Sequence, residues 1–145
     1  MDNIVLDTNV LSELMRPQPN QGVMEWFAKK AGAVFYISAV TRAEILLGIA
    51  LLPAGKKREA LAVAAAEMFS NEFAGRCLPF DETGAERYAQ VVGGRRSVGL
   101  ATSTEDALIA TTALAHGCSL ATRNIKDFQC IEGLVLHDPW DSKAQ

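Results

Sequence analysis

The first strand-like segment of the chain ends in an abrupt change of polarity. The apolar run Asn3–Leu6 is followed directly by Asp7, Thr8 and Asn9. A short apolar run of this kind is typical of a buried strand in a parallel sheet, and polar residues after it lie where open α/β sheets bind ligands. A carboxylate that leaves an apolar strand needs a compensating partner. Asp7 therefore predicts a site completed by groups elsewhere in the chain.

Strand-like and helix-like segments alternate along the chain. Short runs rich in apolar and β-branched residues predict strands over residues 3–6, 34–37, 76–80, 119–122 and 134–136. Helical patterns between Pro and Gly breaks predict helices over residues 10–15, 20–30, 41–52, 56–73, 82–96 and 103–116. Strands separated by helices need crossover connections, so we expect an α/β fold with a mostly parallel sheet of about five strands flanked by helices.

The length of 145 residues suits a single domain with its own core. We expect this domain over residues 1–141, with residues 142–145 as a C-terminal tail. Hydrophobic residues make up 49% of the chain and charged residues 21%, and no run approaches the ~20 apolar residues of a membrane span. The cysteines are far apart and the first residues do not form a signal-peptide pattern, which predicts reduced thiols and a cytoplasmic protein.

The net charge of −3 does not suggest a nucleic-acid-binding protein, since such domains are usually basic. Acids gathered to hold cations would, however, raise the acidic count without repelling an anionic substrate. Basic residues form two local groups, Lys56–Arg58 and Arg95–Arg96 with Arg87 nearby. Each group fits either a solvated helix face or a rim that contacts phosphates.

Three further acids have positions that both structural and functional roles explain. Glu44 and Asp106 begin predicted helices, and Asp127 follows the fourth predicted strand. Taken singly, each fits a helix cap, because the sequence contains Thr41-x-x-Glu44, Ser103-x-x-Asp106 and Asn124-x-x-Asp127. Acids in a first helical turn also suit the helix dipole.

Two features favour a shared site over separate caps. Glu44 lies in line with Leu47 and Leu51, and Asp106 in line with Ile109 and Ala113, so both acids head stripes expected to pack on the sheet. The acids that follow strands one and four meet at the carboxyl edge of the sheet. Four carboxylates in one pocket raise one another's pKa values unless cations neutralise them.

A carboxylate cluster without histidine or cysteine selects Mg²⁺ or Mn²⁺ over zinc. Such a cation lowers the pKa of a bound water and offsets charge on a phosphate under in-line attack, so no side-chain base is required. Asn9, Thr122 and Asn124 are short polar groups that fit a supporting role, orienting ligands, water or phosphate. Each of them singly fits an ordinary turn or cap equally well.

The order of the motifs resembles that of PIN domains. The chain contains Leu6-Asp7-Thr8-Asn9, Ser38-Ala39-Val40-Thr41-x-Ala43-Glu44, Asp106-Ala107-x-Ile109-Ala110 and Ala121-Thr122-Arg123-Asn124-x-x-Asp127-Phe128. Each motif alone is weak, whereas the four together at these spacings are specific. The resemblance extends to Pro139-Trp140, covers essentially the whole chain, and is strongest to the VapC-type toxins of bacterial toxin–antitoxin modules, in the FitB-like branch.

This resemblance implies a PIN fold and an endoribonuclease that hydrolyses RNA with a water activated by Mg²⁺ or Mn²⁺. It also implies a homodimer and a VapB/FitA-like antitoxin, whose DNA-binding half represses the operon, so that DNA contact is indirect. In such families the antitoxin often places a basic side chain into the acidic pocket. The implied catalytic residues are Asp7, Glu44, Asp106 and Asp127, with the first three as metal ligands.

The lead-in to the third acid departs from the family pattern. Residues 101–105 replace the Pro-Ile-Ser type of lead-in, and Glu105 adds an acid beside Asp106. A haloacid dehalogenase phosphatase would need an acid where this chain has Asn9, and a response-regulator receiver fits poorly. The remaining alternative is a non-catalytic PIN-like module whose acidic pocket docks a partner's arginines.

Overall fold

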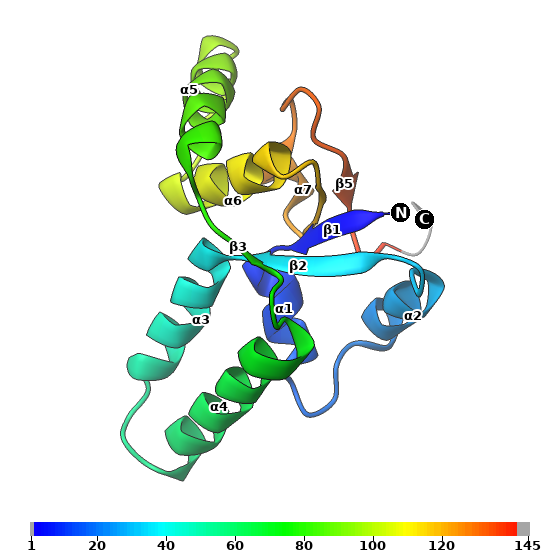
Figure 1. Cartoon of the computed structure of the whole chain (residues 1–145), viewed down its shortest axis with the longest axis vertical. Coiled ribbons are helices and arrows are strands. Elements are labelled where there is room, and N and C mark those ends of the chain that lie inside the picture. The colour runs from blue at the N-terminus through cyan, green and yellow to red at the C-terminus, as the bar shows by residue number, and fades with distance from the viewer. Residues whose placement is uncertain (1, 142–145) are drawn as a thin grey trace.

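The computed structural model describes residues 2–141, and the predicted tail over residues 142–145 lies outside this range. Five strands form one sheet in the order β3-β2-β1-β4-β5, and every neighbouring pair is parallel (Figure 1). The strands are β1 Asn3–Leu6, β2 Val34–Ser38, β3 Cys77–Leu78, β4 Ser119–Ala121 and β5 Leu136–His137. The predicted α/β fold with a parallel sheet of about five strands is confirmed.

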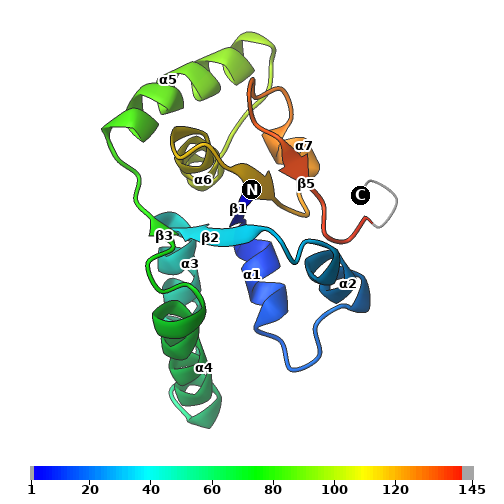
Figure 2. The same cartoon turned by 45° about the vertical axis from the view of Figure 1, so that its right-hand side comes forward.

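Helices cover both faces of this sheet. They are α1 Thr8–Leu14, α2 Gln21–Lys29, α3 Ala39–Ala50, α4 Lys56–Glu67, α5 Glu82–Ser97, α6 Thr104–Ala115 and α7 Ile125–Phe128. Figure 2 shows α1 to α4 on one side of the sheet and α5 to α7 on the other. None of the helices described is long and apolar enough to cross a membrane.

The central strand β1 is buried on both faces because helices cover both. Ile4 and Leu6 pack toward one cluster of buried residues, which includes Val10 of α1 and Ile45 of α3. Val5 packs toward the other cluster, on the side of α6. Successive side chains of a strand point to opposite faces, so the uninterrupted apolar run over residues 4–6 is what a sheet between two helical layers requires.

Several element boundaries differ from the sequence prediction. The third strand was expected over residues 76–80, but it comprises only Cys77–Leu78, because Pro79 has no amide to continue the ladder. The fifth strand lies at Leu136–His137 instead of residues 134–136, since a turn with Gly133 at φ +82° precedes it. The helix expected through residue 73 ends in a π-helical turn, Met68–Glu72.

Candidate functional site

Asp7 lies at the carboxyl end of β1, between β2 and β4, and is only 4% exposed. Both oxygens of its carboxylate accept a hydrogen bond. The backbone amide of Thr8 donates to Oδ1 over 2.8 Å, and the hydroxyl of Thr122 donates to Oδ2 over 2.7 Å. The backbone amide of Asp7 donates to the carbonyl of Ala121 in β4, which extends the sheet by one residue. The carboxylate is therefore fixed at the edge of the sheet.

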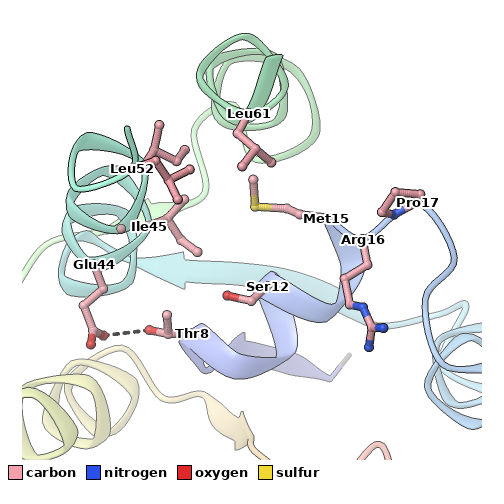
Figure 3. A pocket seen from close by; sticks show the side chains of 11 residues that line it. Thr8, Ser12, Met15, Arg16, Pro17, Glu44, Ile45, Leu52 and Leu61 are labelled. Carbon is pink, nitrogen blue, oxygen red and sulfur yellow. Dashed lines mark hydrogen bonds between the residues drawn. The ribbon is translucent and has the colours of Figure 1, made fainter. Parts of the chain in front are cut away.

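Glu44 of α3 reaches the same edge through a chain of hydroxyl groups. The hydroxyl of Thr8 donates to Glu44 Oε1 over 2.7 Å, as Figure 3 shows. Because Thr8 has a single hydroxyl proton, its 3.0 Å contact with Thr41 is one in which Thr41 donates. Thr41 in turn accepts from the hydroxyl of Ser38 over 3.3 Å. Three buried or half-buried hydroxyls therefore point their protons in one direction, toward a carboxylate.

The predicted capping role of Thr41 and the predicted stripe of α3 are both wrong. The helix begins two residues earlier than predicted and is capped by Ser38, whose Oγ accepts from the amide of Thr41 over 3.0 Å. This earlier start turns Thr41 and Ile45 toward the core, whereas Leu47 is 59% exposed and Leu51 75%. Glu44 consequently lies at the flank of the buried face and is half-buried, but it still contacts Thr8.

Asp106 lies in the first turn of α6, as the sequence predicts. Ser103 caps this helix, and its Oγ accepts from the amide of Asp106 over 3.1 Å. The stripe below Asp106 is buried at Ile109, Ala110 and Ala113, which confirms the predicted orientation of the helix. Asp106 itself is half-buried. Asp106 therefore lies in a capped first turn and also heads the buried stripe of the same helix.

Asp127 and its neighbours are more exposed. Asp127 belongs to the short helix α7, which begins after Asn124, and the predicted side-chain cap between them is wrong, because the Asn124 side chain makes no capping hydrogen bond. Instead, the backbone amide of Asn124 donates to the Thr122 hydroxyl over 3.0 Å. Asn9 Oδ1 accepts from the amide of Arg123 over 3.4 Å. Among the predicted supporting residues, the Thr122 side chain contacts an acid directly, the Asn9 side chain contacts the backbone after β4, and Asn124 contacts the Thr122 hydroxyl through its backbone amide.

The four acids influence one another electrostatically. Burial raises the pKa of Asp7 to about 6, the hydrogen bonds from Thr122 and Thr8 oppose this rise, and the carboxylates of Asp106 and Glu44 add to it. Burial likewise raises the pKa of Asp106, opposed by Ser103 and reinforced by the carboxylates of Asp127, Glu44 and Glu105. The charges that act on both groups are those of other carboxylates, so this edge of the sheet carries a concentrated negative charge.

The donor chemistry of this edge fits Mg²⁺ or Mn²⁺. Within residues 2–141, no three His, Cys, Asp or Glu side chains lie close enough together to hold one ion. Mg²⁺, however, keeps several waters and usually binds proteins through one or two carboxylates. Asp7 and Asp106 supply oxygen donors whose pKa values are raised first by burial and then by neighbouring carboxylates, so a bound cation would favour their ionised forms.

A groove of about 350 Å³ opens beside Glu44 (Figure 3). Thr8 and Glu44 lie at one end of it, and Arg16 lies at the other. Its wall is mostly apolar and comes from α1, α3 and α4 through residues that include Met15, Ile45 and Leu61. The groove thus joins an acidic end to an apolar surface.

The two basic groups of the sequence do not form a common rim. Arg95 is only 2% exposed, so it belongs neither to a solvated helix face nor to a rim that contacts phosphates, the two alternatives that the sequence left open. Lys56, Lys57 and Arg96 are exposed, but α4 and α5 lie on opposite sides of the sheet (Figure 2). The sequence did carry a signal for the burial of Arg95, because it lies three and four residues after Val92 and Val91, on the apolar face of α5.

Comparison with known proteins agrees with this arrangement. The chain is 41% identical over 137 residues to toxin FitB of Neisseria gonorrhoeae, covering 94% of this chain and 98% of that protein. It is 38% identical over 138 residues to the VapC ribonuclease Y4jK of Sinorhizobium fredii, covering 95% of this chain and 98% of that protein. A solved structure of FitAB bound to an IR36 DNA fragment has a TM-score of 0.85 at 40% identity, covering 95% of this chain and 96% of that chain.

A family model for the PIN domain matches residues 4–132. This range includes all four acids and the whole sheet except β5 and Asn3, the first residue of β1. The resemblance predicted from the motifs is confirmed, and the chain belongs to the PIN domain family.

Proposed function

We propose that this protein is the toxin of a toxin–antitoxin module and acts as an endoribonuclease that depends on Mg²⁺ or Mn²⁺. The observation that carries the proposal is the buried Asp7, whose pKa is about 6 and whose charged neighbours are Asp106 and Glu44. The names of two relatives, a toxin and a ribonuclease, support it. A cluster of carboxylates whose negative charges act on one another suits the binding of a hard cation, and a phosphate can then bind to that cation.

In this proposal the acids have different tasks. Asp7 and Asp106 hold the cation, Glu44 adds negative charge beside it, and the more exposed Asp127 orients the water that attacks the phosphate. When bound, the cation supplies a water of lowered pKa and offsets charge on the phosphate. Asp7 must lose its proton before it can bind a cation, so cation affinity rises with pH through the region of its pKa, about 6. Thr8 and Thr122 hold the carboxylates of Glu44 and Asp7 in fixed orientations.

The proposed partners follow from the groove and from the similar structures. A VapB/FitA-like antitoxin would lay an apolar segment along the groove of α1, α3 and α4 and place a basic side chain beside Glu44. The solved FitAB structure is bound to DNA, and we assign the DNA contact of this system to the antitoxin. A homodimer would cover exposed apolar side chains of α3 and α4, such as Leu46 and Val63.

The test is RNA cleavage by the purified protein, free of antitoxin and supplied with Mn²⁺. We expect cleavage that EDTA abolishes and that Asp7→Asn reduces by at least 100-fold, since the variant removes a charge at the centre of the site. Glu86→Gln, an exposed acid on α5, is the matched control and retains full activity. Absence of cleavage by the wild type on total cellular RNA, with toxicity unchanged by Asp7→Asn, would refute the proposal.

The same experiment addresses the alternative of a non-catalytic module whose acidic pocket docks arginines. The groove beside Glu44 is the observation that favours this alternative. A docking module binds an arginine-containing peptide without cleaving RNA, and its affinity for Mn²⁺ need not fall in Asp7→Asn. A nuclease instead loses Mn²⁺ affinity and cleavage together.

A further inference from the structure

Arg95 is a buried cation in the layer that covers the β4 side of the sheet. It lies on the same face of α5 as Val91, which packs in one cluster with Ile109 of α6. A guanidinium keeps its charge at any ordinary pH, so its burial is costly unless its donors find acceptors. No carboxylate among residues 2–141 forms an ion pair with Arg95. Its burial is therefore compensated by neutral oxygen atoms.

The acceptors come from two separate segments of the chain. Nε donates to Thr102 Oγ1 over 2.6 Å, and Nη2 donates to the carbonyl of Ala101 over 3.2 Å. Nη1 donates to the carbonyl of Gln129. Residues 101 and 102 belong to the loop between α5 and α6, whereas residue 129 directly follows α7. The planar guanidinium of Arg95 thus connects two segments that are far apart in sequence.

Each of these segments carries one of the acids. Thr102 precedes Ser103, the residue that caps α6 and accepts from the amide of Asp106. Gln129 lies two residues after Asp127 and is the C-cap of the four-residue helix α7. A helix this short has few internal hydrogen bonds to fix it, so external contacts decide its position.

We propose that Arg95 is a positioning residue, whose guanidinium fixes the segment of Asp106 against the segment of Asp127. This inference rests on the proposed function, because it assigns Arg95 to the arrangement of that site. Arg95 acts through Thr102 and Gln129, and it contacts neither RNA nor a cation. A lysine in its place keeps the charge but cannot donate to three acceptors in one plane.

A positioning role differs from a merely structural one in what it changes. Loss of a core contact lowers stability but leaves the site of the folded molecules intact. Loss of positioning changes the folded molecules themselves, so Mn²⁺ affinity and kcat fall well below the unfolding temperature, whereas KM for RNA is kept. Residues that orient metal ligands from outside typically change metal affinity or activity by 10–100-fold.

The experiment compares Arg95→Lys with Arg96→Lys, because Arg96 is the next residue of α5 and is exposed. Mn²⁺ affinity is measured by titration calorimetry at a temperature where both variants are folded, and amide hydrogen exchange is followed over residues 101–106 and 127–130. For Arg95→Lys we expect Mn²⁺ affinity at least 10-fold weaker, kcat reduced by a similar factor and exchange faster in both segments. Arg96→Lys leaves all three unchanged.

A second variant decides the question if Arg95→Lys does not fold. Thr102→Val removes one acceptor and keeps the shape of the side chain, and we expect Mn²⁺ affinity to fall several-fold. Wild-type Mn²⁺ affinity in the folded variant would overturn the inference. If the wild type binds Mn²⁺ but cleaves no RNA, the proposed nuclease function fails, and the ratio of Mn²⁺ affinities still tests the role of Arg95.

Discussion

Replacing Asp7 by asparagine should stabilise the metal-free protein at neutral and alkaline pH. The ordinary pKa of 3.8 describes Asp7 in the unfolded chain, and the folded state raises it to about 6. The folded protein therefore holds this proton more tightly than the unfolded chain does. The stabilisation from the protonated group is complete below pH 3.8 and is lost as the pH rises through 6.

The size of the effect follows from the same two pKa values. Each pKa unit corresponds to about 1.4 kcal/mol, so the ionised Asp7 costs the folded state about 3 kcal/mol at pH 8 in the absence of a cation. Asparagine avoids this cost, but its amide group cannot accept from both Thr8 and Thr122 as the carboxylate does. One lost hydrogen bond costs about 1 kcal/mol. The net expectation is a gain of about 2 kcal/mol at pH 8.

The measurement is urea unfolding of the wild type and Asp7→Asn in EDTA at pH 4 and pH 8. At pH 8 the variant should be more stable by about 2 kcal/mol, which raises Tm by roughly 6 °C for a domain of this size. At pH 4 most of that advantage should disappear, because the wild-type carboxyl is then largely protonated when folded. A variant that is less stable than the wild type at pH 8 would refute the reasoning, since Asp7 would then be a favourable charge.

Three further predictions concern the same edge of the sheet. Thr122→Val removes a hydrogen bond that favours the ionised form of Asp7, so the pKa of Asp7, followed by carbon NMR, should rise above its present value of about 6. Ser103→Ala removes the cap of α6 and should lower the free energy of unfolding by about 1 kcal/mol in urea titrations. Mn²⁺ at 100 times its dissociation constant should stabilise the wild type by about 2.7 kcal/mol at pH 8, and Asp7→Asn much less.

The sequence predicted best those features that local pattern determines. The abrupt end of β1 placed Asp7 at the edge of the sheet, and the apolar stripe of α6 placed Asp106 on its buried side. The orientation of Glu44 depended on where α3 begins, and both Ser38 and Thr41 are acceptable caps. Ser38 becomes the cap because β2 continues through it and pairs with Leu78. That pairing is a tertiary contact, which no local pattern contains.

Arg95 shows a different limit of sequence reasoning. Adjacent arginines on a helix usually face water, and the structure separates Arg95 from Arg96 by turning only the first toward α6. Its place after Val91 and Val92 was a signal of burial. Its acceptors at residues 101, 102 and 129 lie in loops, whose paths are set by the packing of α6 against α5 and α7. The hydrogen bonds of a buried arginine to two separate loops can be identified only from the three-dimensional arrangement of those loops.

The hydrogen bonds around Asp7 and Glu44 explain why this edge tolerates its own charge. Thr122 and Thr8 each donate one proton to a carboxylate, which stabilises the ionised forms without neutralising them. The remaining negative charge can be compensated by a divalent cation or by a guanidinium from a partner. Both would use the same carboxylates, so binding of one must weaken binding of the other by the same factor. Under the proposed function, a basic side chain beside Glu44 therefore inhibits by competing for charge, and Mn²⁺ should weaken the antitoxin as much as the antitoxin weakens Mn²⁺.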